Sequence, residues 1–258
     1  MPTLPINAWS AESLRLTVFP TSNGASRSPD WWQLATGNEP GDITTNPKRG
    51  IVAAEGPFHQ GKLVFRSMLD RMDWLFVPPD NSAEVLFMRS EVPTLGSLVE
   101  AIRAFSESME RWLKTADLPE VARIAFGGTV VHPMDDRKEA YLQLRDYIPV
   151  RIDPDSTDIL YQVNLPTLGS KTIEGIGFNR LSKWFVGNYS VMGFSIVQNM
   201  GGPIMQTSPE LALRVELDVN TVPSLQGIIP KDRLIEVFRE LVAIGQSIVA
   251  DGVGKIDQ

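Results

Sequence analysis

The chain has 258 residues, of which 43% are hydrophobic and 21% charged, and its formal net charge is −7 at pH 7. A chain of this length can bury a core without disulfides, as one large domain or as two fused halves. The acidic balance argues against a protein that coats nucleic acid, since binding phosphates requires a basic surface, although a local basic patch is still allowed. No cysteine and only two histidines exclude zinc sites of the Cys₄ or Cys₂His₂ type.

The chain also lacks the sequence features of a membrane or secreted protein. No stretch approaches the roughly 18 consecutive apolar residues of a membrane span. The N-terminal residues lack the basic and apolar regions of a signal peptide, and no cysteine is present to form disulfides. We therefore expect a cytoplasmic protein that makes no membrane contact.

The first half of the chain combines strand patterns with one helix pattern. Alternating apolar residues predict a strand over residues 13–20, and a short helix is expected at residues 29–36 inside a connection rich in Gly, Pro and Ser. Residues 61–79 predict a hairpin. Apolar residues at three- and four-residue steps then predict an amphipathic helix over residues 94–116, one face of which must pack on a sheet.

The second half also combines strand patterns with helix patterns. Further strands are expected at residues 121–132, with Gly127 and Gly128 as a bulge, and at residues 159–166, 172–198 and 211–219. Residues 172–198 have the longest alternating pattern and predict two or three adjoining strands, with turns or bulges at their glycines. Asp136 and Glu139 have the spacing of a capping box and predict a helix that runs through Tyr147. An amphipathic helix at residues 231–250 closes the chain.

These patterns together predict an α+β fold. Alternation in most strands indicates mainly antiparallel sheets with one face covered by the long amphipathic helices at 94–116 and 231–250. A Val-Pro-[Thr/Ser]-Leu segment precedes both helices, so two similar halves, residues 1–117 and 118–258, are one interpretation. Their packing as one domain is the other.

Aromatic residues in the predicted loops are candidate partner-binding residues. Trp31, Trp32 and Phe58, together with Trp9, are large apolar side chains of the kind that anchor protein interfaces. The alternative for Trp31 and Trp32 is that they attach their own loop to the core. Replacement of both tryptophans by Ala separates the two: lost thermal stability would indicate core attachment, whereas unchanged stability with a lost complex would indicate partner binding.

A second candidate surface mixes cations with aromatics. Arg180, Lys183, Trp184 and Tyr189 could stack bases and contact phosphates of single-stranded nucleic acid. A strand whose aromatic side chains face the core while its cations face water explains the same pattern, and the acidic net charge favours that interpretation.

Three groups of polar residues are candidates for a metal or nuclease site. The first is His132, Asp135, Asp136 and Lys138, the second is Asp153, Asp155 and Asp158, and the third is Glu216, Asp218 and Asn220. A helix cap explains Asp136, a solvated turn explains the second group, and the solvent face of a strand explains the third. Phosphate-loop, dinucleotide and hydrolase motifs are absent, so we expect no catalytic residue, no metal and no cofactor.

The order of features resembles a sporadically distributed family of uncharacterised bacterial proteins. The resemblance rests on the strand DRMDWLFVPPD, the helix TLGSLVEAIRAFSESMERWLK, the strand VARIAFGGTVVHP and the late strand LRVELDVN before a closing helix. It implies a bacterial α+β protein without an assigned activity, scattered among genomes as defence and mobile-element genes are.

We therefore expect a non-catalytic interaction subunit of a bacterial multi-component system, with another protein or a second copy of the chain as partner. The alternative is a nucleic-acid-binding protein or a metal-dependent nuclease.

Overall fold

The computed structural model describes residues 2–21, 30–79, 92–153, 155–167, 169–170, 174–195, 204–222 and 227–253. Side chains are described for the same residues except 49, 189–195 and 204–210.

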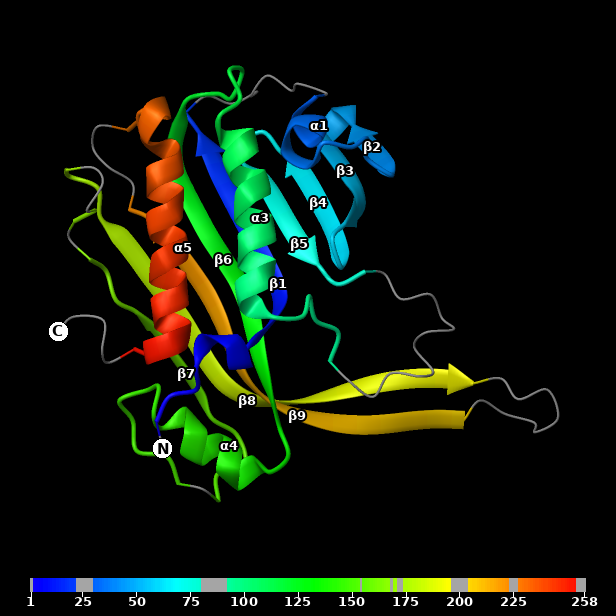
Figure 1. Ribbon diagram of the computed structural model, residues 1–258, viewed down its shortest axis with the longest axis vertical. Helices are drawn as coiled ribbons and strands as arrows, with labels where there is room; N and C mark the ends of the chain where they lie inside the picture. Colours follow the sequence, from blue (N-terminus) through cyan, green and yellow to red (C-terminus); the bar gives the residue numbers. More distant parts are fainter. Residues whose placement is uncertain are drawn as a thin grey trace.

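The described strands form one antiparallel sheet with the order β2-β3-β4-β5-β1-β6-β9-β8-β7 (Figure 1). The strands are β1 (Ser10–Pro20), β2 (Asp42–Asn46), β3 (Ile51–Phe58), β4 (Gly61–Ser67), β5 (Met72–Val77), β6 (Val121–Met134), β7 (Leu160–Asn164), β8 (Phe178–Ser195) and β9 (Ile204–Thr221). Each pair of neighbours runs antiparallel. The α+β class and the antiparallel pairing predicted from alternation are therefore confirmed.

Two helices lie side by side along one face of this sheet (Figure 1). The α-helices of the described residues are α1 (Trp31–Thr36), α3 (Leu98–Leu113), α4 (Arg137–Leu144) and α5 (Leu234–Asp251). Arg239 of α5 forms an ion pair with Glu110 of α3 at 2.6 Å, which links the two helices at their exposed side. We call the face beneath α3 and α5 the helix face, and the opposite one the open face.

Helix α3 begins later than the periodicity predicts, because the residues before it pair with a strand. Leu95 donates its backbone N–H to Ala11 of β1, and Ser97 forms a bridge with Ser10. Gly96 between them has a φ of 75°, a left-handed conformation that favours glycine and interrupts a helix. The apolar pattern extends to Leu95 because its side chain is also buried, and periodicity alone does not distinguish such a buried residue from part of the helix.

The main apolar core of the described residues lies between the helices and the helix face. It contains Trp74, Trp112 and Phe126, and it draws residues from both sides of position 117. The sheet also continues across that position, because β1 pairs with β6 from Ser10↔Val131 to Pro20↔Val121. The described parts of residues 1–117 and 118–258 therefore share one sheet and the main core.

The sequence predicted two or three strands over residues 172–198, and this prediction is wrong for the described part. The part from Phe178 to Ser195 is one strand, β8, in unbroken register with β9. Gly187 and Gly193 lie inside that register and are not turns. The bulge expected at Gly127 and Gly128 is also absent, because the register shift at this place lies in β1, between Ala11 and Ser13.

Strands β8 and β9 extend beyond the rest of the sheet as a two-stranded ribbon (Figure 1). Strand β7 pairs with β8 only up to Phe185, and β6 pairs with β9 only from Leu211 onward. Among the described residues, the remainder of each strand therefore pairs only with the other strand of the ribbon.

Candidate functional site

The open face carries the polar residues of the central strands, because successive side chains of a strand point to opposite faces. In β1, Leu14 and Leu16 are buried toward the helices, whereas Arg15 between them lies on the open face and is partly exposed. In β9, Val215 and Val219 are likewise buried.

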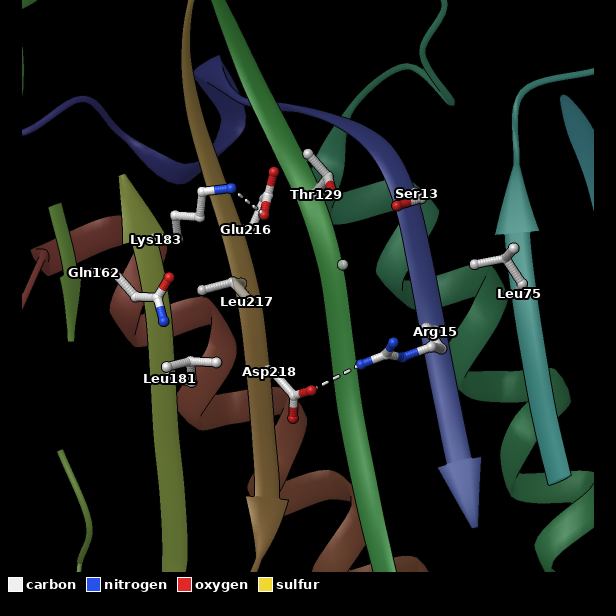
Figure 2. Close-up of a pocket in the computed structure, with 11 residues that line it drawn as sticks. Ser13, Arg15, Leu75, Thr129, Gln162, Leu181, Lys183, Glu216, Leu217 and Asp218 are labelled. Atoms are coloured by element: carbon white, nitrogen blue, oxygen red, sulfur yellow. Dashed lines mark hydrogen bonds and ion pairs between the residues drawn. The ribbon is translucent and has the colours of Figure 1, made fainter. Parts of the chain in front are cut away.

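A hollow of about 300 Å³ lies at the centre of this face (Figure 2). Its lining includes Ser13 and Arg15 of β1, Thr129 of β6, Glu216 and Asp218 of β9, and Lys183 of β8. Leu75 and Leu181 add apolar surface at opposite sides of the hollow. The lining comes from six adjacent strands, from β5 to β7 in sheet order, and it combines two cations, two carboxylates and apolar side chains.

Gly127 forms the floor beneath one ion pair. Arg15 and Asp218 belong to different neighbours of β6, and both stand opposite Gly127 in the pairing register. Arg15 reaches across the glycine and donates from Nη2 to Asp218 Oδ2 at 2.9 Å. A Cβ at Gly127 would lie 2.8 Å from the Leu217 carbonyl oxygen and 3.1 Å from Arg15 Nη2, so any side chain there would displace the pair.

The second ion pair links β8 and β9. Lys183 Nζ lies 3.2 Å from Glu216 Oε2, and the two residues are directly opposite in the register. Arg214, one position further along the open face of β9, forms an ion pair with Glu12 at 3.0 Å. The ammonium of Lys183 also lies 5.1 Å from the ring centre of Phe185, within the range of a cation–π contact.

A chain of side-chain amides continues from Asp218 toward the sheet edge. Asn220 Nδ2 donates to Asp218 Oδ1 at 2.7 Å, and Asn179 Nδ2 donates to Asn220 Oδ1 at 3.0 Å. Asn164 Nδ2 donates to Asn179 Oδ1 at 3.1 Å, which extends the network to β7. These bonds fix the position of the Asp218 carboxylate, since one of its oxygens accepts from Asn220 and the other from Arg15.

The aromatic residues expected at a partner surface are buried instead. Trp31, Trp32 and Phe58 are 1%, 3% and 7% exposed, and Trp9 is 1% exposed. Trp31 Nε1 donates to Asp117 Oδ1 at 2.9 Å, and the Trp32 ring lies 5.8 Å from that of Trp74. The expectation of exposed anchors is corrected: in this fold, the α1 tryptophans attach their segment to the core.

The residues expected at a nucleic-acid surface lie on different faces. Arg180 and Trp184 are on the helix face and buried, and Arg180 Nε donates to the Leu165 carbonyl oxygen at 2.8 Å. Lys183 is on the open face, and the Tyr189 side chain lies outside the described residues. A stacking platform needs its aromatic and cationic groups on one exposed surface, so the structure does not bring this set together.

The polar clusters also have structural partners. Asp136 caps α4, as its spacing predicted, because Oδ1 accepts from the backbone N–H groups of Lys138 and Glu139. Lys138 forms a 2.6 Å ion pair with Asp155 of the second group, and this contact raises the pKa of Lys138. Within the described residues, no group of three or more His, Asp or Glu side chains is arranged to hold a metal ion.

Sequence reasoning found part of the site. It placed Glu216, Asp218 and Asn220 on one strand face, which is confirmed, and it named Lys183 for another purpose. It missed Arg15, although a cation between two apolar residues of a predicted strand is a detectable signal. It could not identify Gly127 as a floor, because that role depends on which strands flank β6.

Comparison with known proteins adds no relative: no family model matches the chain, and neither does any curated protein. Among the helices of the described residues, none has the length and apolar character needed to cross a membrane.

Proposed function

We propose that this protein is a non-catalytic interaction subunit of a bacterial multi-component system, and that it binds a partner protein on the open face of its sheet. The observation that carries the proposal is the central hollow, where charged groups of both signs surround apolar side chains at partial exposure. Arginine and apolar contacts within a polar surround are characteristic of protein interfaces.

The ion pairs of the open face contribute little to the stability of the fold. The side chains of Arg15 and Asp218 are 40% and 33% exposed, and those of Lys183 and Glu216 are 30% and 38% exposed. Pairs this exposed stabilise a fold by about 0–1 kcal/mol.

The same pairing disfavours phosphate as the ligand. Each cation of the hollow is held by a carboxylate, so the surface offers no concentrated positive charge to a nucleic-acid backbone. The nucleic-acid alternative therefore lacks a supporting observation. Salt-sensitive binding in a gel-shift assay, lost in Arg180→Ala/Lys183→Ala, is the result that would restore it.

The resemblance to sporadically distributed bacterial proteins suggests a defence or mobile-element system, and the N-terminal residues, which lack signal-peptide features, suggest a cytoplasmic setting. The partner is then expected among the proteins encoded beside this gene. Co-expression of each neighbour, followed by size-exclusion chromatography and a measured dissociation constant for any complex, tests this expectation.

A pair of charge reversals identifies the face that binds. Lys183→Glu reverses a charge on the open face and is expected to weaken the complex at least about tenfold, since a partner that is complementary to Lys183 would then meet a like charge. Arg103→Glu makes the same change on an exposed position of α3 and is expected to leave affinity unchanged. Equal affinities for both variants and the wild type would contradict the proposal.

A further inference from the structure

The ribbon formed by β8 and β9 presents two strand edges with unequal protection. Proteins normally blunt exposed edges with proline or charged residues, because unpaired backbone groups there can pair with another chain. On the β9 side, Pro209 and Glu210 lie in the projecting part. On the β8 side, residues 186–195 contain neither proline nor a charged residue.

We propose that the β8 edge of the ribbon pairs with the same edge of a second copy of this chain, forming a two-fold dimer. Two antiparallel copies of one edge are self-complementary, because a two-fold axis gives each strand the donors and acceptors of the other. A two-stranded ribbon is marginally stable in water, whereas the dimer would make it the centre of a four-stranded sheet. This inference is independent of the open-face proposal.

The sequence of the edge permits full overlap. Pairing residues 186–195 with themselves in antiparallel register places Gly187 opposite Phe194 and Tyr189 opposite Met192 of the second copy. An aromatic residue opposite a glycine is a favourable cross-strand arrangement. No charged residue meets another, because the whole stretch 187–209 is uncharged.

The placement of the ribbon also permits approach of a second molecule. It projects away from the helices and the central strands (Figure 1). Residues 186–195 span about 30 Å at about 3.3 Å per residue, so two ribbons can overlap while the two acidic bodies stay apart. A strand from an unrelated protein could pair with the same backbone groups. Sedimentation of the purified chain alone distinguishes the two partners, because no other protein is then present.

Sedimentation velocity of the purified full chain across a concentration series tests the proposal. We expect a species of twice the 28.6 kDa chain mass. Ser190→Lys/Val191→Lys places lysines opposite lysines at the two-fold axis and is expected to weaken the dimer at least about tenfold. Ser190→Glu/Val191→Glu is expected to do the same.

An equimolar mixture of the two variants supplies the decisive result. Opposite charges then face each other across the axis, and we expect the dimer to return. Thr207→Lys/Ser208→Lys, at the paired positions on β9 or next to them, is the control and is expected to dimerise as the wild type does. A wild-type monomer, a dimer that persists in both charged variants, or a mixture that stays monomeric would each overturn the proposal.

Discussion

Truncation of Trp32 measures how firmly α1 is attached to the core. A buried tryptophan removes about 200 Å² from water, worth about 5 kcal/mol at about 25 cal/mol per Å². Compaction of the unfolded chain reduces such values by roughly 10–40%, so we expect Trp32→Ala to lower the free energy of unfolding by about 3–5 kcal/mol. The 3% exposure of this side chain and its contact with Trp74 place it at full burial.

Urea denaturation followed by circular dichroism provides the measurement, and the same helix provides the control. Leu34 is 46% exposed, so Leu34→Ala is expected to change the unfolding free energy by no more than about 0.5 kcal/mol. A loss below about 1 kcal/mol in Trp32→Ala would refute the reasoning. It would show that α1 is not held by the core, and it would restore the tryptophans as candidate partner contacts.

Three further predictions concern the open face, the α4 cap and a buried phenol. Gly127→Val is expected to destabilise the fold by about 1–3 kcal/mol in urea denaturation, because a side chain there meets the Leu217 carbonyl. Arg15→Ala, at a 40% exposed position, should lower the unfolding free energy by less than about 1 kcal/mol. Equal losses in the two variants would contradict the role of Gly127 as the floor of the site. Asp136→Ala is expected to lower the unfolding free energy by about 0.5–2 kcal/mol through loss of the α4 cap, with exposed Asp135→Ala near neutral as its control. Burial raises the pKa of Tyr147, so its contribution to folding stability is present in full below the ordinary tyrosine pKa of about 10 and is lost as pH rises through the folded pKa. The melting temperature of Tyr147→Phe should therefore decline less steeply above about pH 10 than that of the wild type. An unchanged slope would contradict this prediction.

The sequence predicted the positions of strands and helices better than it predicted which strands pair in the sheet. Local periodicity identified β1, α3 and α5, because each has one apolar face against a shared core. It could not place β1 beside both β5 and β6, since that pairing joins residues far apart in the chain. The length of β8 was also missed, because Gly187 and Gly193 are tolerated inside a strand while glycine normally indicates a turn.

The candidate site was harder to predict for the same reason. Arg15, Gly127 and Asp218 are far apart in sequence, and their relation arises only when β6 lies between β1 and β9. The exposure of Trp31 and Trp32 was also predicted wrongly. They occur in a segment of loop-like composition, yet α1 packs them against α3 and β5. Composition describes a segment, whereas burial depends on what the fold places beside it.

The open face can be tested directly by site-specific photo-cross-linking in the cells that produce the protein. A benzophenone side chain at Gln162, an exposed residue that lines the hollow, reports what contacts the open face, and one at exposed Glu107 of α3 reports the opposite side. We expect a discrete adduct with one other protein from Gln162 and none from Glu107. An adduct from Glu107 alone, or none from Gln162, would contradict the claim that this face binds a partner.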